Sequence, residues 1–298
     1  MVESGPFLDA RHRASTLDAI AWATLHQMFA PADVDKQALN ASTFGYLCRP
    51  AVCTDRQLCL ATRYALLFFY LDDTPGHTLA SRLDRSDPCR TLRSCPAGAA
   101  WLDDHRELAR CSDAVRRDFE RSLADYLQSL IDERDADSQH LTLDEHWDLR
   151  RRSVFVDTWI AQWIVSLDLR PPFDGAPARA RALCVDLVIL SNDLGSLHRD
   201  AAAGPDGELN LVHTYARTRG CSEREAVAAV IDDYNRQADE VRRILSGLSS
   251  DPELSSYADL IRGVIDGNLR AMMMLAHRYP EAQERLAALQ PISASAEA

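Results

Sequence analysis

The stretch Ser191–Asp200, SNDLGSLHRD, ends a long apolar run, RALCVDLVIL, and carries three oxygen-bearing side chains at equal intervals: Asn192, Ser196 and Asp200. Positions four and eight apart stay on one face of an α-helix, because the helix has 3.6 residues per turn. An amide oxygen, a hydroxyl and a carboxylate are hard-oxygen ligands. Such ligands suit Mg²⁺, which keeps waters or substrate phosphate oxygens in its shell. The stretch therefore predicts a helix that holds a magnesium ion.

The neighbours of these three residues refine the prediction. Asp193 lies off the helix face that the three share, and Arg199 stands beside Asp200, where it could meet a bound anion. The alternative is a polar helix end that carries Asn, Ser and Asp without binding anything. The rest of the chain has to decide between the two interpretations.

Composition excludes several classes of function. At 298 residues the chain can bury a large core, and its net charge of −12 makes nonspecific nucleic-acid binding a poor fit. None of the eight cysteines forms a C-x-x-C pair, so a zinc site is not expected. We find no apolar signal core at the start and no apolar run of membrane-spanning length. We expect a cytoplasmic protein with free thiols.

Helical periodicity runs through most of the chain, whereas strand alternation is hard to find. Ser222 with Glu225 forms a capping box ahead of an apolar-periodic run. No linker divides the chain, so we predict one all-α domain over residues 1–298, with disordered ends at about 1–12 and 290–298. The expected helices cover residues 15–29, 54–72, 98–134, 141–168, 176–200, 222–248 and 252–278.

A second motif, LLFFYLDDTPG at residues 66–76, ends an apolar helix in Asp72 and Asp73 before Pro75-Gly76 stops it. Two adjacent carboxylates are costly there unless solvent or cations pair with them, and the negative end of the helix dipole adds to the cost. A divalent cation resolves both problems, and a solvated helix end is the alternative. Residues 103–107, DDHRE, match an acidic metal motif more literally, but no apolar run leads into them. A solvated, charged helix face is the better interpretation there.

Two further clusters contain arginine. Arg150 opens the segment RRRSVFVD, in which β-branched and aromatic residues weaken the helix, and Trp159 and Trp163 follow on one helix face. Near the end of the last long helix, Arg278 and Tyr279 stand side by side, and both can donate to a phosphate. A basic surface turn with core tryptophans is the alternative for the first cluster.

Taken in order, the four clusters resemble class I terpene synthases of the bacterial type. In that family an aspartate-rich motif ends one helix, an N-D-x-x-S-x-x-x-E motif ends a facing helix, an Arg lies upstream of the second motif, and an Arg-Tyr pair lies near the C-terminus. Three positions depart from the family: Gly76 replaces a carboxylate, Asp200 replaces Glu, and no Trp precedes the Arg-Tyr pair. The counterparts in this chain are Asp72 and Asp73; Asn192, Ser196 and Asp200; Arg150; and Arg278 with Tyr279.

The resemblance implies a helical bundle with the two metal motifs facing each other across the mouth of an apolar cavity. It implies a Mg²⁺-dependent lyase of isoprenoid biosynthesis, a terpene synthase or cyclase. Three Mg²⁺ ions would bridge the metal motifs to a substrate diphosphate, whose allylic C–O bond ionises, and the carbocation then cyclises away from water. The diphosphate donors would be Arg150, Arg199, Arg278 and Tyr279, and the aromatic lining would come from Phe68, Phe69, Trp159 and Trp163.

The resemblance implies a prenyl diphosphate as substrate, but no motif encodes its chain length. The length of this protein favours a C20 diphosphate, linear or bicyclic, and therefore a diterpene synthase; farnesyl diphosphate is the alternative. A non-catalytic scaffold with decayed motifs stays open because of Gly76 and Asp200, and so does a homodimer. A chain-elongating transferase would need a second DDxxD at Asn192–Asp200, and a di-iron bundle would need Glu-x-x-His pairs, which we do not find.

Overall fold

The computed structural model describes residues 7–73, 81, 83–137, 140–202, 209–275, 279 and 282–293, and every regular element among them is helical. This confirms the predicted all-α class. The elements are α1 (Ala10–Leu25), α2 (Val34–Leu47), α3 (Asp55–Asp73), α5 (Pro88–Arg93), α6 (Pro96–Asp104), η1 (Arg106–Ala109), α7 (Asp113–Asp135), α8 (Leu143–Ser153), α9 (Val156–Ser166), α10 (Gly175–Ala202), α11 (Leu211–Arg219), α12 (Glu223–Ser249), α13 (Ser255–Met274) and α14 (Ala282–Ala287).

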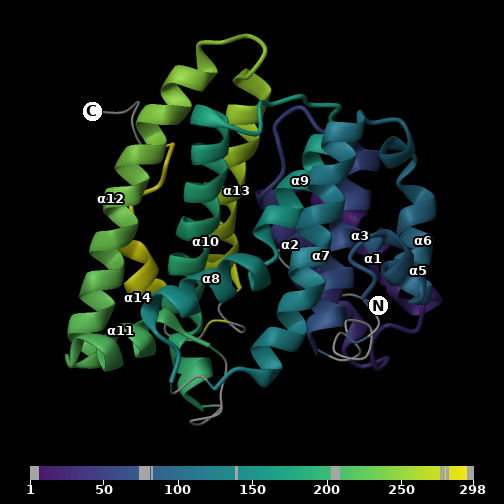
Figure 1. Ribbon diagram of the computed structural model, residues 1–298. Helices are drawn as coiled ribbons and strands as arrows, with labels where there is room; N and C mark the ends of the chain where they lie inside the picture. The colour runs from purple at the N-terminus through teal and green to yellow at the C-terminus, as the bar shows by residue number, and fades with distance from the viewer. Residues whose placement is uncertain are drawn as a thin grey trace.

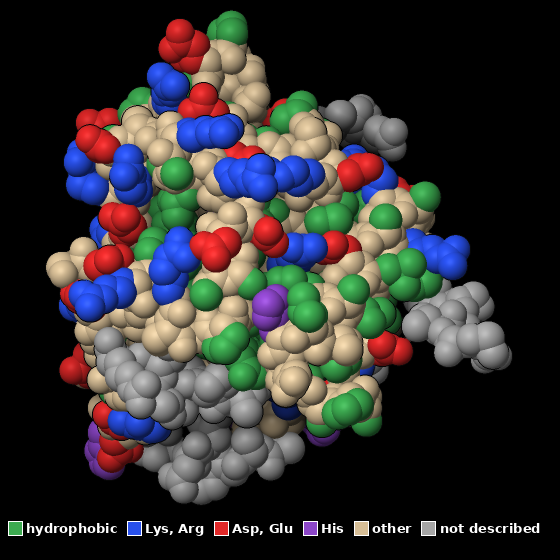
Figure 2. All heavy atoms as spheres, turned by 90° about the vertical axis from the view of Figure 1, so that its right-hand side faces the viewer, with side chains coloured by type: hydrophobic (Ala, Val, Ile, Leu, Met, Phe, Trp, Pro, Cys, Tyr) green, Lys and Arg blue, Asp and Glu red, His purple; other side chains and the backbone are tan. Residues whose placement is uncertain are grey.

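The long helices form two groups that meet in the middle of the bundle (Figure 1). On one side α10 packs on α12 and α13, and on the other α3 packs on α1 and α2, with α7 beside α9. Helices α2 and α9 connect the groups, because both also contact α13. On the face that Figure 2 shows, Arg and Lys side chains alternate with Asp and Glu, so charges of one sign do not gather among the described residues there.

Helix α10 takes its place from its apolar face. Leu183, Leu187, Leu190 and Leu194 recur at helical spacing, and none is more than 1% exposed. An apolar stripe of this width has to be covered by other helices, and α12 and α13 cover it. The polar residues of the same helix, from Asn192 onward, are thereby held at fixed positions near its C-terminal end.

Helices α8 and α12 each begin with a capping box. The predicted box at Ser222 is confirmed, because the Ser222 hydroxyl accepts from the amide of Glu225 at 3.3 Å while Glu225 accepts from the amide of Ser222 at 2.9 Å. An equivalent box, which sequence reasoning missed, joins Thr142 and Glu145 at the start of α8. The second box fixes the first turn of the helix that carries Arg150.

The helix boundaries differ from the prediction mainly where one predicted helix is divided into several. The stretch 98–134 is α6, η1 and α7, since Ser112 caps a new helix by accepting from the amide of Val115 at 3.4 Å. The stretch 141–168 is α8 and α9, separated at Phe155, which adopts the left-handed conformation with φ 62°. Four helices among the described residues were not predicted at all, and they are α2, α5, α11 and α14.

The predicted disorder at about 1–12 and 290–298 stays a prediction, and the described residues of both ends make hydrogen bonds. Asp9 caps α1 by accepting from the amide of His12 at 2.9 Å, and His12 is buried. Near the other end, Asp266 accepts from the amides of Ile292 at 2.6 Å and Ser293 at 3.0 Å. Residues 1–6 and 294–298 lie outside the described residues.

Gly267 sets how closely α13 approaches α2. A Cβ at this position would lie 2.2 Å from the carbonyl oxygen of Leu47 and 2.6 Å from the amide nitrogen of Cys48. These are backbone atoms and cannot rotate away. We expect Gly267→Ala to lower the free energy of unfolding by about 1–3 kcal/mol, which is typical of overpacking, as measured by urea denaturation.

The matched control is Gly247→Ala in α12, where an added Cβ would meet nothing within 4 Å. Alanine is the better helix former by about 1 kcal/mol, so this variant should be at least as stable as the parent. Equal stability of both variants would show that α13 can move away from α2 freely.

Candidate active site

One cavity of about 860 Å³ lies between the two groups of helices, and most of the predicted site residues line it. Most of its polar lining comes from the C-terminal parts of α3, α7, α8 and α10, so the partial negative charges of several helix ends add to those of the carboxylates. Such a place favours cations. The polar lining includes Asp72, Glu133, Arg134, Asp137, Arg150, Asn192, Ser196, Arg199, Asp200 and Tyr279; the apolar lining includes Phe44, Ala65, Phe68, Phe69, Val154, Phe155, Val156, Trp159, Val188 and Val264.

The three predicted ligands of α10 face this cavity together. The Ser196 hydroxyl donates to Asp200 Oδ2 at 2.5 Å, and Arg199 donates from Nε to Asp200 Oδ1 at 3.2 Å. Ser196 and Asp200 are buried, and Asn192 is partly exposed. A hydroxyl that donates its proton to Asp200 keeps its lone pairs for a cation, so this arrangement is compatible with metal binding.

Asn210 holds the end of this face and was missed by sequence reasoning. Its amide donates to Asp200 Oδ2 and to the backbone carbonyl of Asp193, each at 2.8 Å. Its side-chain oxygen accepts from the amide of Val212 at 2.9 Å and caps α11. An Asn before an apolar-periodic run signals an N-cap, but nothing in the sequence ties that cap to a carboxylate ten residues earlier.

Asp193 lies off the ligand face, as predicted, and it holds Arg150. Arg150 donates from Nη2 to Asp193 Oδ1 at 2.7 Å, and the amide of Leu211 donates to Asp193 Oδ2 at 2.8 Å. Burial raises the pKa of the Asp193 carboxyl, although Arg150 and the Leu211 amide act in the opposite direction. The Asp193 side chain is 1% exposed, so the pair ties α8 to α10 in a buried position.

Arg150 reaches the cavity from the last turn of α8. It also approaches Glu133 Oε1 at 3.5 Å and donates to the Ser153 hydroxyl at 3.4 Å. Burial lowers the pKa of Arg150, but attraction to Asp193 and Glu133 more than offsets this and leaves the pKa raised. A guanidinium that stays charged beside the cavity can serve as a donor for an anionic ligand.

The aspartate motif at the end of α3, Asp72 and Asp73, is described only in part. Asp72 lies in the last turn of α3, is exposed and lines the same cavity as the polar residues of α10. The side chain of Asp73, Gly76 and the predicted donor Arg278 lie outside the described residues. Tyr279 is 7% exposed and lines the cavity.

The alternative acidic motif lies elsewhere. Asp103 pairs with Arg93 at 2.6 Å, Asp104 pairs with Arg63 at 2.5 Å, and neither lines the cavity. Both aspartates are more than half exposed. The structure therefore agrees with the interpretation of Asp103 and Asp104 as charged surface residues, whereas His105, which follows them, is buried.

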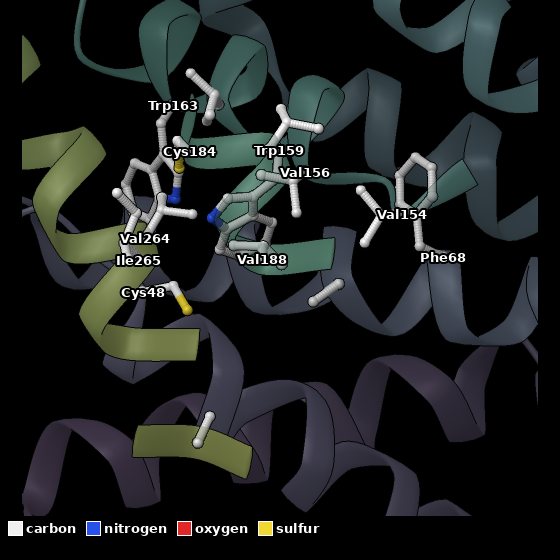
Figure 3. Close-up of a cluster of buried hydrophobic side chains, with 14 of the residues drawn as sticks. Cys48, Phe68, Val154, Val156, Trp159, Trp163, Cys184, Val188, Val264 and Ile265 are labelled. Atoms are coloured by element: carbon white, nitrogen blue, oxygen red, sulfur yellow. The ribbon is translucent and has the colours of Figure 1, made fainter. Parts of the chain in front are cut away.

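The aromatic residues divide between the cavity and the core. Phe68 and Phe69 line the cavity as predicted, as does Trp159, but Trp163 is fully buried and is absent from the lining. The predicted contact between Trp163 and the substrate stays a prediction. Four residues along α9 carry Trp163 about 6 Å farther down the axis, to the layer of Cys184 and Ile265 (Figure 3).

Phe155 takes part in the lining instead. It stacks on Phe68 with ring centroids 4.4 Å apart and an interplanar angle of 20°. The left-handed backbone at Phe155 separates α8 from α9, and its ring lies against Phe68 of α3 and Tyr126 of α7. The sequence signal was the aromatic and β-branched run after Arg150, which indicates a weak helix but not the direction of this ring.

The donor set fits a hard divalent cation. Among the described residues, no group of three His, Cys, Asp or Glu side chains is placed to hold a metal ion. The α10 face instead combines one carboxylate with an amide oxygen and a hydroxyl. Oxygen donors of this kind suit Mg²⁺, which takes few protein ligands.

No described helix is both long enough and apolar enough to cross a bilayer.

Solved structures with the same fold are terpene synthases. The linalool/nerolidol synthase from Streptomyces clavuligerus, in complex with 2-fluorogeranyl diphosphate, is 20% identical, with a TM-score of 0.74 over 88% of this chain and 98% of that chain. The structure of α-eudesmol synthase is 18% identical, with a TM-score of 0.73 over 92% and 99%. No curated protein matches the chain. The likeness confirms the class I terpene synthase fold.

A family model that matches the sequence shows to which family the chain belongs. The model of terpene synthase family 2, C-terminal metal binding, matches residues 64–240, which is more than half of the chain. The chain therefore belongs to this family of terpene synthases, which confirms the predicted family and enzyme class. The match includes Asp72, Arg150 and the α10 face, and a metal-binding domain agrees with a divalent cation there.

Proposed function

We propose that this terpene synthase ionises an allylic prenyl diphosphate with the help of Mg²⁺ and releases diphosphate. The single observation that supports this best is the shared cavity, with carboxylates and arginines at one end and stacked aromatic rings along its side. An anionic head group and a hydrocarbon chain require these two environments side by side.

The residues divide the work by their chemistry. Mg²⁺ would be held by Asp72, with Asp73, and by Asn192, Ser196 and Asp200, and when bound it supplies positive charge that stabilises the departing diphosphate. Three ions are expected from the family resemblance. Arg150, Arg199 and Tyr279 line the same end and would donate to diphosphate oxygens, together with Arg278.

The reaction starts when the allylic C–O bond breaks and its electron pair leaves with the diphosphate. Phe68, Phe155 and Trp159 present aromatic rings to the cavity, and their faces can stabilise the carbocation that remains. Apolar neighbours such as Val188 and Val264 keep water away, so that cyclisation or loss of a proton competes with capture by water.

We propose a C20 chain, with farnesyl diphosphate as the alternative. The cavity volume of about 860 Å³ is near the upper end of the roughly 300–1,000 Å³ that small-molecule sites span. A large cavity supports a long prenyl chain.

The test is incubation with C10, C15 and C20 prenyl diphosphates, with Mg²⁺ or with chelator, followed by a diphosphate assay and mass spectrometry of the products. We expect release only with Mg²⁺, and most with the C20 substrate. Full turnover in chelator would refute the metal role. No release from any substrate would leave the non-catalytic scaffold as the function.

A further inference from the structure

Asn268 of α13 contacts the predicted metal ligand Asn192. It is 6% exposed and lines the cavity. Its side-chain amide donates to Asn192 Oδ1 at 3.2 Å and to the Ser191 hydroxyl oxygen at 3.1 Å, with Met272 Sδ at 3.5 Å. The oxygen that would bind Mg²⁺ therefore already accepts a hydrogen bond from a neighbouring helix.

The direction of this hydrogen bond is fixed by Ser191. The Ser191 hydroxyl donates to the backbone carbonyls of Leu187 at 3.0 Å and Val188 at 3.1 Å, so toward Asn268 it can only accept. Asn268 must then turn its NH₂ group toward Ser191. The same NH₂ group faces Asn192, which must present its oxygen and not its own NH₂ group.

The position of Asn268 is set by close helix packing on both sides. The adjacent Gly267 lies against the backbone of Leu47 and Cys48 in α2. On the α10 side, a Cβ at Gly195 would lie 2.1 Å from Met272 Cε, so the Met272 side chain fills the space beside Gly195. Asn268 therefore has little freedom to leave Asn192.

We propose that Asn268 is a positioning residue that keeps the amide oxygen of Asn192 available to the metal. If the Asn192 amide flips by 180°, it presents its NH₂ group, which cannot bind a cation. The orientation of this amide therefore decides whether Asn192 is a ligand at all. Partners of this kind typically contribute about 10–100-fold to metal affinity. The inference rests on the proposed function, since it assumes that Asn192 is a ligand.

The test measures Mg²⁺ affinity by calorimetry with inorganic diphosphate present, so it does not depend on turnover. Asn268→Leu removes the donor and should weaken Mg²⁺ binding by about 10–100-fold. Asn268→Asp replaces the donor with an acceptor and should weaken it at least as much. The matched control is Asn40→Leu, another fully buried asparagine, which lies outside the cavity lining and should leave Mg²⁺ affinity unchanged.

A second background separates positioning from a general structural role. In Asn192→Asp both terminal atoms are oxygens, so orientation no longer matters. Asn268→Leu should then cost little or no Mg²⁺ affinity. An equal loss in both backgrounds, or no loss in either, would overturn the proposal. If Asn192→Ala binds Mg²⁺ as tightly as the parent, Asn192 is not a metal ligand. That result would refute this part of the proposed function and not the positioning role alone.

Discussion

Replacing Arg150 with alanine should abolish diphosphate release and should also lower the free energy of unfolding by about 3–5 kcal/mol. The cause of the second effect is Asp193, whose side chain is 1% exposed and would keep a buried charge without its counterion. The cause of the first is the loss of a charged donor that lines the cavity. Turnover is measured by diphosphate release and stability by urea denaturation.

Two variants separate these effects. Arg150→Ala combined with Asp193→Asn removes the uncompensated charge, so it should recover most of the stability while staying inactive. Arg151→Ala breaks the pair with Asp186, at 2.7 and 3.0 Å, outside the cavity lining, so it should keep its turnover. If the Arg150→Ala enzyme is active and the Arg151→Ala enzyme is inactive, the anion-binding role belongs to Arg151 and not to Arg150.

Asp72→Ala should reduce turnover by about 10²–10³-fold, because a cation bound at the cavity is worth several kcal/mol at 1.36 kcal/mol per tenfold. The control is Asp103→Ala, which removes only an exposed pair with Arg93 and should cost at most about 1 kcal/mol of stability and no activity. Steady-state kinetics at saturating Mg²⁺ compare the two variants. If Asp103→Ala loses more turnover than Asp72→Ala, the aspartate metal motif lies in α6 and not in α3.

The shared face of three polar side chains on α10 could be predicted because it depends on one helix. The spacing of Asn192, Ser196 and Asp200 is a property of the α-helical repeat, and the apolar run before them ensures that the repeat is helical. The structure brings all three to the cavity. Asp72 was predicted for a similar reason, since an apolar helix that ends in carboxylates leaves few other interpretations.

Contacts between helices could not be predicted in the same way. Asn210 and Asn268 hold the ligand face, but their partners lie 10–17 and 76–77 residues away in the chain. Helix α2 was missed because its buried face includes Asn40, Ser42 and Thr43, so no apolar stripe marks it. The break at Phe155 depends on a left-handed residue that sequence does not favour at an aromatic position.

The close approach at Gly267 has a consequence for changing substrate preference. Where α13 meets α2, backbone lies against backbone, so no substitution there can enlarge the cavity and every larger residue distorts the bundle. The rings of Phe44, Phe68 and Phe155 also line the cavity, and shorter side chains there would leave more room while the backbone contact at Gly267 stays unchanged. We therefore expect variation that alters chain-length selectivity to be tolerated at these three rings and not at Gly267, and a mutant library restricted to the rings samples the accessible sizes.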